Sequence, residues 1–237
     1  MVLTNSLTVP VIFLTALLIW SANHQMEIKE KFKAERKDVA RFMRRLYKHG
    51  LTTTSGGNIS LRLTDNLILI TPSATDKGRM KWKEVGIVNI FGENLTPHLK
   101  PSIETAMHLA IYKKKKDILA IVHAHPVFAS LFTAIKAKIN TNLTAEAKAI
   151  LGDPLFVRYA LMGSTALAEV AAENILKSDI LLLENHGILT TGTNLLQAFD
   201  KIEVLENAAK MTLMTEMTGK RRPLDKARIL ELERLFR

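Results

Sequence analysis

The sequence predicts an α/β protein in which helices cover a sheet. Segments with helical periodicity alternate with short apolar runs of strand length, and hairpin-like pairs of such runs occur early in the chain. Hydrophobic residues make up 47% of the chain, as in a folded globular protein. Because neither an internal repeat nor a low-complexity linker divides residues 26–237, we expect one domain there.

The expected helices carry apolar residues at three- and four-residue steps, which is the pattern of an amphipathic helix. Capping residues mark several helix ends: Ser102 and Ser164 are expected N-caps, and Gly50 and Gly152 are expected to stop two helices. The expected helices cover residues 26–49, 102–117, 126–137, 144–152, 164–177, 194–217 and 224–236.

The expected strands are apolar runs bounded by turn residues. "NISLRL" and "NLILIT" flank "TD" and predict a hairpin, and "VGIVNIFG" with "NLTPHLK" predicts a second pair. Two later runs, "ILAIVHAH" and "DILLLENHG", predict buried strands that each lead into histidine.

Charge and cysteine content exclude several classes of site. The chain has 33 Lys and Arg against 23 Asp and Glu, a formal charge of +10. Its basic runs lack interleaved aromatic residues, so we expect solvated helix ends and no nucleic-acid partner. Without cysteines, a tightly bound metal would need histidine, carboxylate or carbonyl ligands.

Residues 1–25 form an apolar extension that is separate from the expected domain. Its run "VPVIFLTALLIW" has about a dozen apolar residues, fewer than the roughly 20 of a membrane span. No basic residue precedes this run, unlike in a signal peptide. Three explanations stay open, in this order: a true start at Met26, a weak signal or anchor, and a helix that packs on a partner. We expect no membrane partner for the domain itself.

Three histidines at strand ends are candidate metal ligands. Residues i and i+2 of a strand project from the same face, so His123 and His125 can reach one ion. His186 follows another apolar strand and is expected at the rim of the same sheet. Three neutral imidazoles with a vacant fourth position are typical of a catalytic zinc site. The alternative is that these histidines only close strands. For the other four we expect surface or packing roles: His24, His49, His98 and His108.

Glu104 is the candidate acid/base. It is expected in the first turn of the helix after "KPS", where backbone N–H groups favour an anion. Glu104 could therefore simply stabilise that helix. Its alternative role is that of a general base beside the metal.

Six motifs, in this order, resemble those of the class II aldolase/adducin family over about residues 30–218: "GGNIS", "ITPSATDKG", "KPSIETAMH", "HAHP", "YALMGSTALAE" and "ENHGILTTG". The resemblance implies a three-layer α/β/α fold with a largely antiparallel or mixed sheet. It also implies a cytoplasmic homotetramer with active sites between subunits. Zinc or another divalent cation would be bound by His123, His125 and His186, with Glu104 as the acid/base. The residues matching the family's phosphate site are Gly57, Asn58, Ser73 and Ser102.

The implied reaction is aldol cleavage of a ketose phosphate similar to L-fuculose 1-phosphate, giving dihydroxyacetone phosphate and an aldehyde through a metal-stabilised enediolate. An L-ribulose-5-phosphate 4-epimerase or a sugar-phosphate dehydratase would keep the same metal site. A noncatalytic adducin-like assembly module is the alternative from a different class. One departure from the family concerns the substrate: Ile103 replaces the second serine of the pair before the glutamate.

Overall fold

The computed structural model describes residues 32–135 and 137–235. Contacts divide the chain into two units, Met1–Ala34 and Glu35–Arg237. The elements below belong to the second unit, apart from the first two residues of helix α2. The apolar run at 9–20 and the start of the first expected helix lie outside the described residues.

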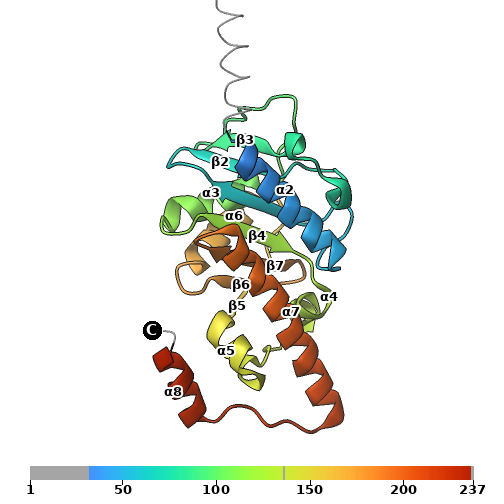
Figure 1. Ribbon diagram of the computed structural model, residues 1–237, viewed down its shortest axis with the longest axis vertical. Coiled ribbons are helices and arrows are strands. Elements are labelled where there is room, and N and C mark those ends of the chain that lie inside the picture. Colours follow the sequence, from blue (N-terminus) through green and yellow to red (C-terminus); the bar gives the residue numbers. More distant parts are fainter. Residues whose placement is uncertain (1–31, 136, 236–237) are drawn as a thin grey trace, which may run out of the picture. The chain divides into compact units, whose positions relative to one another are not determined.

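One mixed sheet forms the centre of the second unit. Its seven strands lie in the order β3-β2-β1-β4-β7-β6-β5 (Figure 1). Neighbouring strands are antiparallel except β5 and β6, which are parallel. This confirms the expected mixed sheet. The strands are β1 Asn58–Arg62, β2 Leu67–Ile70, β3 Gly86–Asn89, β4 Ala120–Ala124, β5 Leu155–Val157, β6 Ile180–Leu183 and β7 Gly187–Gly192.

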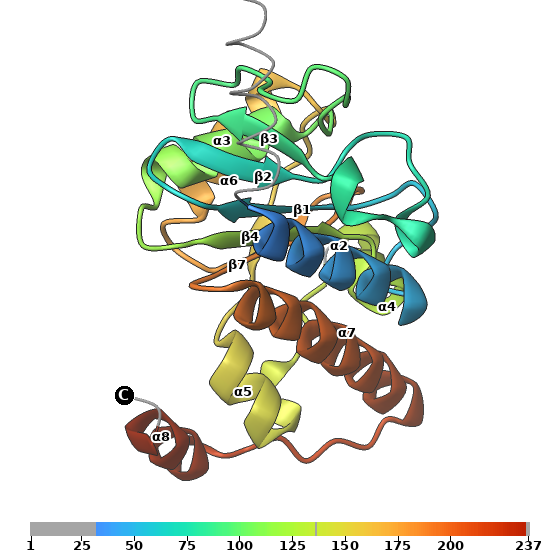
Figure 2. The same ribbon diagram turned by 45° about the horizontal axis from the view of Figure 1, so that its top comes forward.

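Helices cover both faces of the sheet, as Figure 2 shows. Helices α3 and α6 share one apolar cluster with strand residues such as Ile121 and Leu181. On the opposite face lie α2, α4 and α7, where the rings of Phe42 and Phe199 are 5.3 Å apart. This confirms the α/β/α layers. None of the described helices is both long and apolar enough to span a membrane. The described α-helices are α2 Lys33–Lys48, α3 Thr105–Lys114, α4 Val127–Ile135, α5 Ala145–Leu151, α6 Thr165–Asn174, α7 Leu195–Thr218 and α8 Lys226–Leu235.

The prediction that Ser102 caps a helix is wrong. Helix α3 begins at Thr105, and the N-cap position belongs to Glu104, whose side chain makes no capping bond. The reason lies in the preceding loop, where Pro101 forms a β-bridge with Pro72 and so keeps that backbone extended. The expected caps Ser164 and Gly152 are confirmed, since the Ser164 hydroxyl accepts from Leu167 N and Gly152 is the C-cap of α5.

The second predicted hairpin is also wrong in part. Segment 85–92 contains β3, but segment 94–100 forms only an isolated bridge, between Val88 and Asn94. The Thr96 hydroxyl accepts a hydrogen bond from Ile87 N, so a side chain replaces the backbone partner that a strand would supply. Strands β5 and β7 were not predicted, and β7 forms part of the candidate site.

Candidate active site

The sheet brings the three candidate ligands together at one edge. His123 lies inside β4, and His125 lies one residue beyond the end of that strand. His186 ends the short turn between β6 and β7, in which Asn185 has a φ of 52°. One nitrogen from each ring lies within 4.8 Å of the other two. The expectation that the three histidines converge is therefore met in geometry.

The spacing of two of these nitrogens is close to that expected on a tetrahedral metal ion. The Nε2 atoms of His123 and His125 are 3.0 Å apart. Two imidazole nitrogens on one tetrahedral zinc would be about 3.3 Å apart, given Zn–N bonds of about 2.0–2.1 Å. His123 Nδ1 donates a hydrogen bond to Ile188 O at 2.9 Å, so the lone pair of this ring is on Nε2, toward the other histidines.

Burial keeps two of the imidazoles neutral. Burial, with a smaller contribution from the nearby His186, lowers the pKa of His123 to about 3. Burial likewise lowers the pKa of His125 to about 3, with contributions from His123 and His186. A metal ligand must present an unprotonated nitrogen. These two rings therefore offer a lone pair at any pH near neutrality.

Glu104 lies beside the same nitrogens. Its Oε2 is 3.2 Å from His123 Nε2, and its Oε1 is 3.2 Å from His186 Nε2. Asn58 Nδ2 donates to Oε2 at 2.8 Å and so orients the carboxylate, while Oε1 accepts no hydrogen bond from a described residue. A buried carboxylate with a free oxygen facing the histidines can exchange a proton with a molecule bound there.

Gly187 is a site residue that sequence reasoning missed. A Cβ at this position would lie 2.5 Å from Cδ2 of His125 and 2.7 Å from Ala124 O. The His125 ring can therefore occupy its position only because residue 187 has no side chain. The signal in the sequence was the glycine that directly follows His186 in "ENHG".

Three of the candidate phosphate residues lie on loops, and the fourth, Asn58, begins strand β1. Gly57 has a φ of +65°. Asn58 contacts Glu104, and the Ser102 hydroxyl accepts from the backbone N–H of Glu104 at 3.3 Å. The Ser73 hydroxyl donates to Pro101 O at 3.1 Å and accepts from Ile103 N at 3.0 Å. Ser73 thus ties two loops together, and its one hydroxyl proton is already used.

None of the other histidines that the structure describes belongs to this group of converging nitrogens. His108 is fully buried on α3, where its Nδ1 is hydrogen-bonded to Ser60 Oγ at 2.6 Å. His49 Nδ1 is 2.6 Å from Glu203 Oε1, and His98 is exposed. His24 lies outside the described residues.

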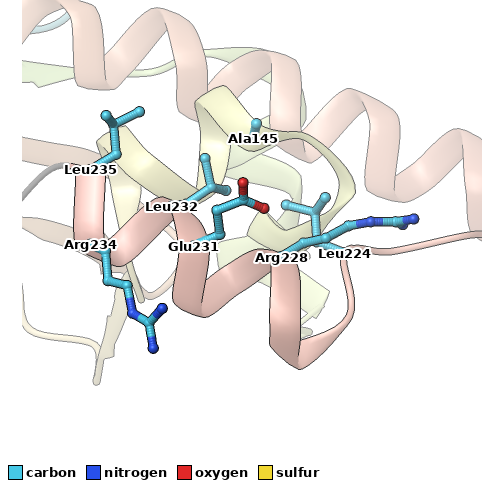
Figure 3. Close-up of a pocket in the computed structure, with 7 residues that line it drawn as sticks. All are labelled: Ala145, Leu224, Arg228, Glu231, Leu232, Arg234 and Leu235. Atoms are coloured by element: carbon cyan, nitrogen blue, oxygen red, sulfur yellow. The ribbon is translucent and has the colours of Figure 1, made fainter.

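A separate cavity of about 590 Å³ lies between α5 and α8 (Figure 3). Its lining shares no residue with the histidine group, so it is not part of the candidate site. The lining residues are Ala145, Leu224, Arg228, Glu231, Leu232, Arg234 and Leu235.

Comparison with known proteins identifies the family. The family described as Class II Aldolase and Adducin N-terminal domain matches residues 37–213. The chain belongs to this family. It is 34% identical over 186 residues to the L-fuculose phosphate aldolase of Methanocaldococcus jannaschii, covering 78% of this chain and 99% of that protein. It is 33% identical to the 3-oxo-tetronate 4-phosphate decarboxylase of Haemophilus influenzae, over 75% of this chain and 86% of that protein.

A solved structure agrees with both family and fold. An L-fuculose 1-phosphate aldolase superimposes with a TM-score of 0.78 at 30% identity, covering 85% of this chain and 95% of that one. The expectation of a class II aldolase, a carbon–carbon lyase, is therefore confirmed. A purely structural adducin-like role is set aside.

Proposed function

We propose that this class II aldolase uses a divalent cation, zinc in the first instance, to cleave a ketose phosphate into dihydroxyacetone phosphate and an aldehyde. The observation that carries the proposal is the convergence of three imidazole nitrogens within 4.8 Å, with the Glu104 carboxylate 3.2 Å from two of them. A cation held by His123, His125 and His186 would act as a Lewis acid for negative charge that develops on substrate oxygens.

Glu104 is proposed to move the proton. Its Oε1, which accepts no hydrogen bond from a described residue, is the oxygen that can take a proton from the substrate or return one, because Oε2 is occupied by the Asn58 amide. Burial of the carboxylate, which is 4% exposed, excludes water from this transfer. The amide of Asn58 fixes the carboxylate, so the proton is exchanged at a defined place.

Gly57, Asn58, Ser73 and Ser102 are proposed to form the site of the substrate phosphate. The relatives named above act on phosphorylated compounds, which supports a phosphorylated substrate. For Ser73 to donate to a phosphate oxygen, its hydroxyl must first release Pro101 O. Ile103 adds no hydroxyl, so backbone N–H groups near Gly57 would have to supply part of the recognition.

Decarboxylation of a 3-oxo acid phosphate is a second candidate, favoured by the identity to the Haemophilus influenzae decarboxylase. Both reactions break a carbon–carbon bond next to a carbonyl and need the same cation and proton handling. The 4-epimerase and dehydratase alternatives also share this site. Product analysis separates cleavage from decarboxylation, because aldol cleavage releases an aldehyde and no carbon dioxide, whereas decarboxylation releases carbon dioxide and no aldehyde.

We also propose a cytoplasmic homotetramer with active sites between subunits, and a domain that starts at Met26. Exposed apolar side chains close to Glu104 and Glu184 support the shared site: Ile103 is 52% exposed and Tyr159 is 61% exposed, and the Tyr159 N–H donates to Glu184. Light scattering of the full chain and of a chain starting at Met26 tests the tetramer and the start at Met26. A monomer with full activity would contradict the shared site.

The decisive experiment combines metal analysis with cleavage assays on ketose 1-phosphates, pentulose 5-phosphates and 3-oxo acid phosphates. Glu104→Gln should retain the metal and lose about 10²–10⁴-fold in turnover, because the amide cannot accept the proton. Wild-type turnover in this variant would remove Glu104 from its role. A wild-type protein that binds no divalent cation would overturn the proposed function itself.

A further inference from the structure

Lys77 is a buried cation without a carboxylate partner among the described residues. Its side chain is almost inaccessible, at 1% exposure. Its Nζ donates to Pro72 O and, at 3.4 Å, to Thr75 Oγ1, and both acceptors are uncharged. The buried Lys201 differs, because its ammonium forms an ion pair with Asp179 at 2.9 Å.

An unpaired buried ammonium is costly. Removing a charge from water destabilises the folded chain unless a counter-charge or several hydrogen bonds replace the water. Burial lowers the pKa of Lys77 to about 8, with the charge of Glu84 opposing the shift, so the side chain remains mostly protonated near neutral pH. The fold therefore keeps a positive charge here and provides no direct ion pair for it within the described residues.

Lys77 lies where three loops meet. Its backbone N–H donates to Thr54 O at 2.9 Å, and its side chain reaches Pro72 O in the next loop. Ser73 continues this connection, since its backbone N–H donates to Lys100 O at 3.0 Å. The linked segments 54–58, 72–77 and 100–104 carry all four of the proposed phosphate residues.

Those four residues supply only neutral donors. Asn58, Ser73 and Ser102 offer amide and hydroxyl groups, and Gly57 offers its backbone. A phosphate group carries close to two negative charges at neutral pH, and neutral donors alone compensate such a charge poorly. The four proposed phosphate residues thus supply no positive charge, and the adjoining loop holds one that forms no ion pair within the described part of the chain.

We propose that Lys77 is a positioning residue for phosphate. Its buried ammonium holds the 72–76 loop in place, and its positive charge attracts the substrate phosphate across that loop. This rests on the proposed function, because the anion is the substrate phosphate. Lys77 would thus contribute to substrate recognition, although it does not touch the reacting atoms.

The test measures inorganic phosphate as a competitive inhibitor of the metal-loaded enzyme. Lys77→Met keeps the apolar stem and removes the charge, and it should raise the phosphate inhibition constant and KM about tenfold while kcat changes little. Lys77→Arg restores the charge and should return both constants toward the wild type. Metal content should equal that of the wild type in both variants. Lys81→Met, at an exposed lysine four residues further along the chain, is the matched control and should leave phosphate inhibition unchanged.

Two results would overturn the inference. One is a Lys77→Met enzyme that phosphate inhibits as strongly as it inhibits the wild type. The other is a Lys77→Arg enzyme that phosphate inhibits as weakly as it inhibits the methionine variant. If the methionine variant does not fold, Lys77→Gln takes its place, because it keeps an N–H for Pro72 O without the charge. A metal-loaded wild type that phosphate does not inhibit would instead remove the phosphate site of the proposed function, and this role with it.

Discussion

Replacing Gly187 by alanine should weaken metal binding as well as the fold. The new Cβ would lie 2.5 Å from His125 Cδ2 and 3.3 Å from His123 Cε1. Carbon atoms in contact are usually about 3.5–4.0 Å apart, so the His125 ring must move by roughly 1 Å. Overpacking of this kind costs about 1–3 kcal/mol of folding free energy. A ligand ring displaced this far should lower metal affinity by roughly 10–100-fold, as loss of an orienting contact does.

The assay is competition for zinc between the protein and a chelator of known affinity, together with urea unfolding of the metal-free protein. Gly192→Ala is the matched control, because Gly192 ends the same strand and its Cβ would meet Ala198 N at 2.8 Å. This control should lose stability but keep the wild-type affinity for zinc. Equal zinc affinities of wild type and Gly187→Ala would refute the steric reasoning. An equal loss of zinc affinity in Gly187→Ala and Gly192→Ala would mean that a distortion of strand β7, and not a displacement of the His125 ring, lowers the affinity.

Two further predictions concern the scaffold. Glu206→Gln should lower the unfolding free energy of the metal-free protein by about 1 kcal/mol, because the Glu206 carboxylate accepts from two backbone N–H groups at the start of α4, at 3.0 and 2.8 Å. An unchanged urea midpoint would contradict this. For Asp179, burial alone would raise the pKa, but hydrogen bonds from Lys115 and Lys201 lower it from 3.8 to about 2. Because this pKa is depressed, the ionised Asp179 stabilises the fold above about pH 4, and this contribution disappears as the pH falls toward 2. The contribution amounts to about 1 kcal/mol, because the side chain is 40% exposed and solvent screens its charge. Urea unfolding midpoints of the wild type and of Asp179→Asn, recorded from pH 5 to 2, measure this contribution.

Some of the fold followed from local patterns in the sequence. The hairpin of β1 and β2 was predictable because two apolar runs flank a two-residue turn. The helix limits at Ser164 and Gly152 followed from capping chemistry, which depends only on neighbouring residues. The approach of His123 to His125 followed from the two-residue period of a strand.

Other features depend on contacts between distant segments, which local patterns do not contain. The start of α3 depends on the bridge between Pro72 and Pro101, nearly 30 residues apart in the chain. The hydrogen bond from Asn58 to Glu104 joins residues separated by 46 positions. Resemblance to a family could suggest that both residues belong to one site, but it could not indicate that Asn58 orients the carboxylate.

The register of three central strands explains why the candidate site exists at all. Because these strands are antiparallel, the start of β1, the end of β4 and the start of β7 meet at one edge: Asn58 pairs with His123, and Ala124 pairs with Ile188. His186 then lies beside His123, since it directly precedes β7. A slip of one residue between β4 and a neighbour would turn His123 to the other face of the sheet. The apolar residues that fix this register, such as Ile121 and Leu189 in the cluster under α3 and α6, therefore also fix the geometry of the candidate metal site. Substitutions there should reduce metal affinity as well as stability, although these side chains do not belong to the histidine group.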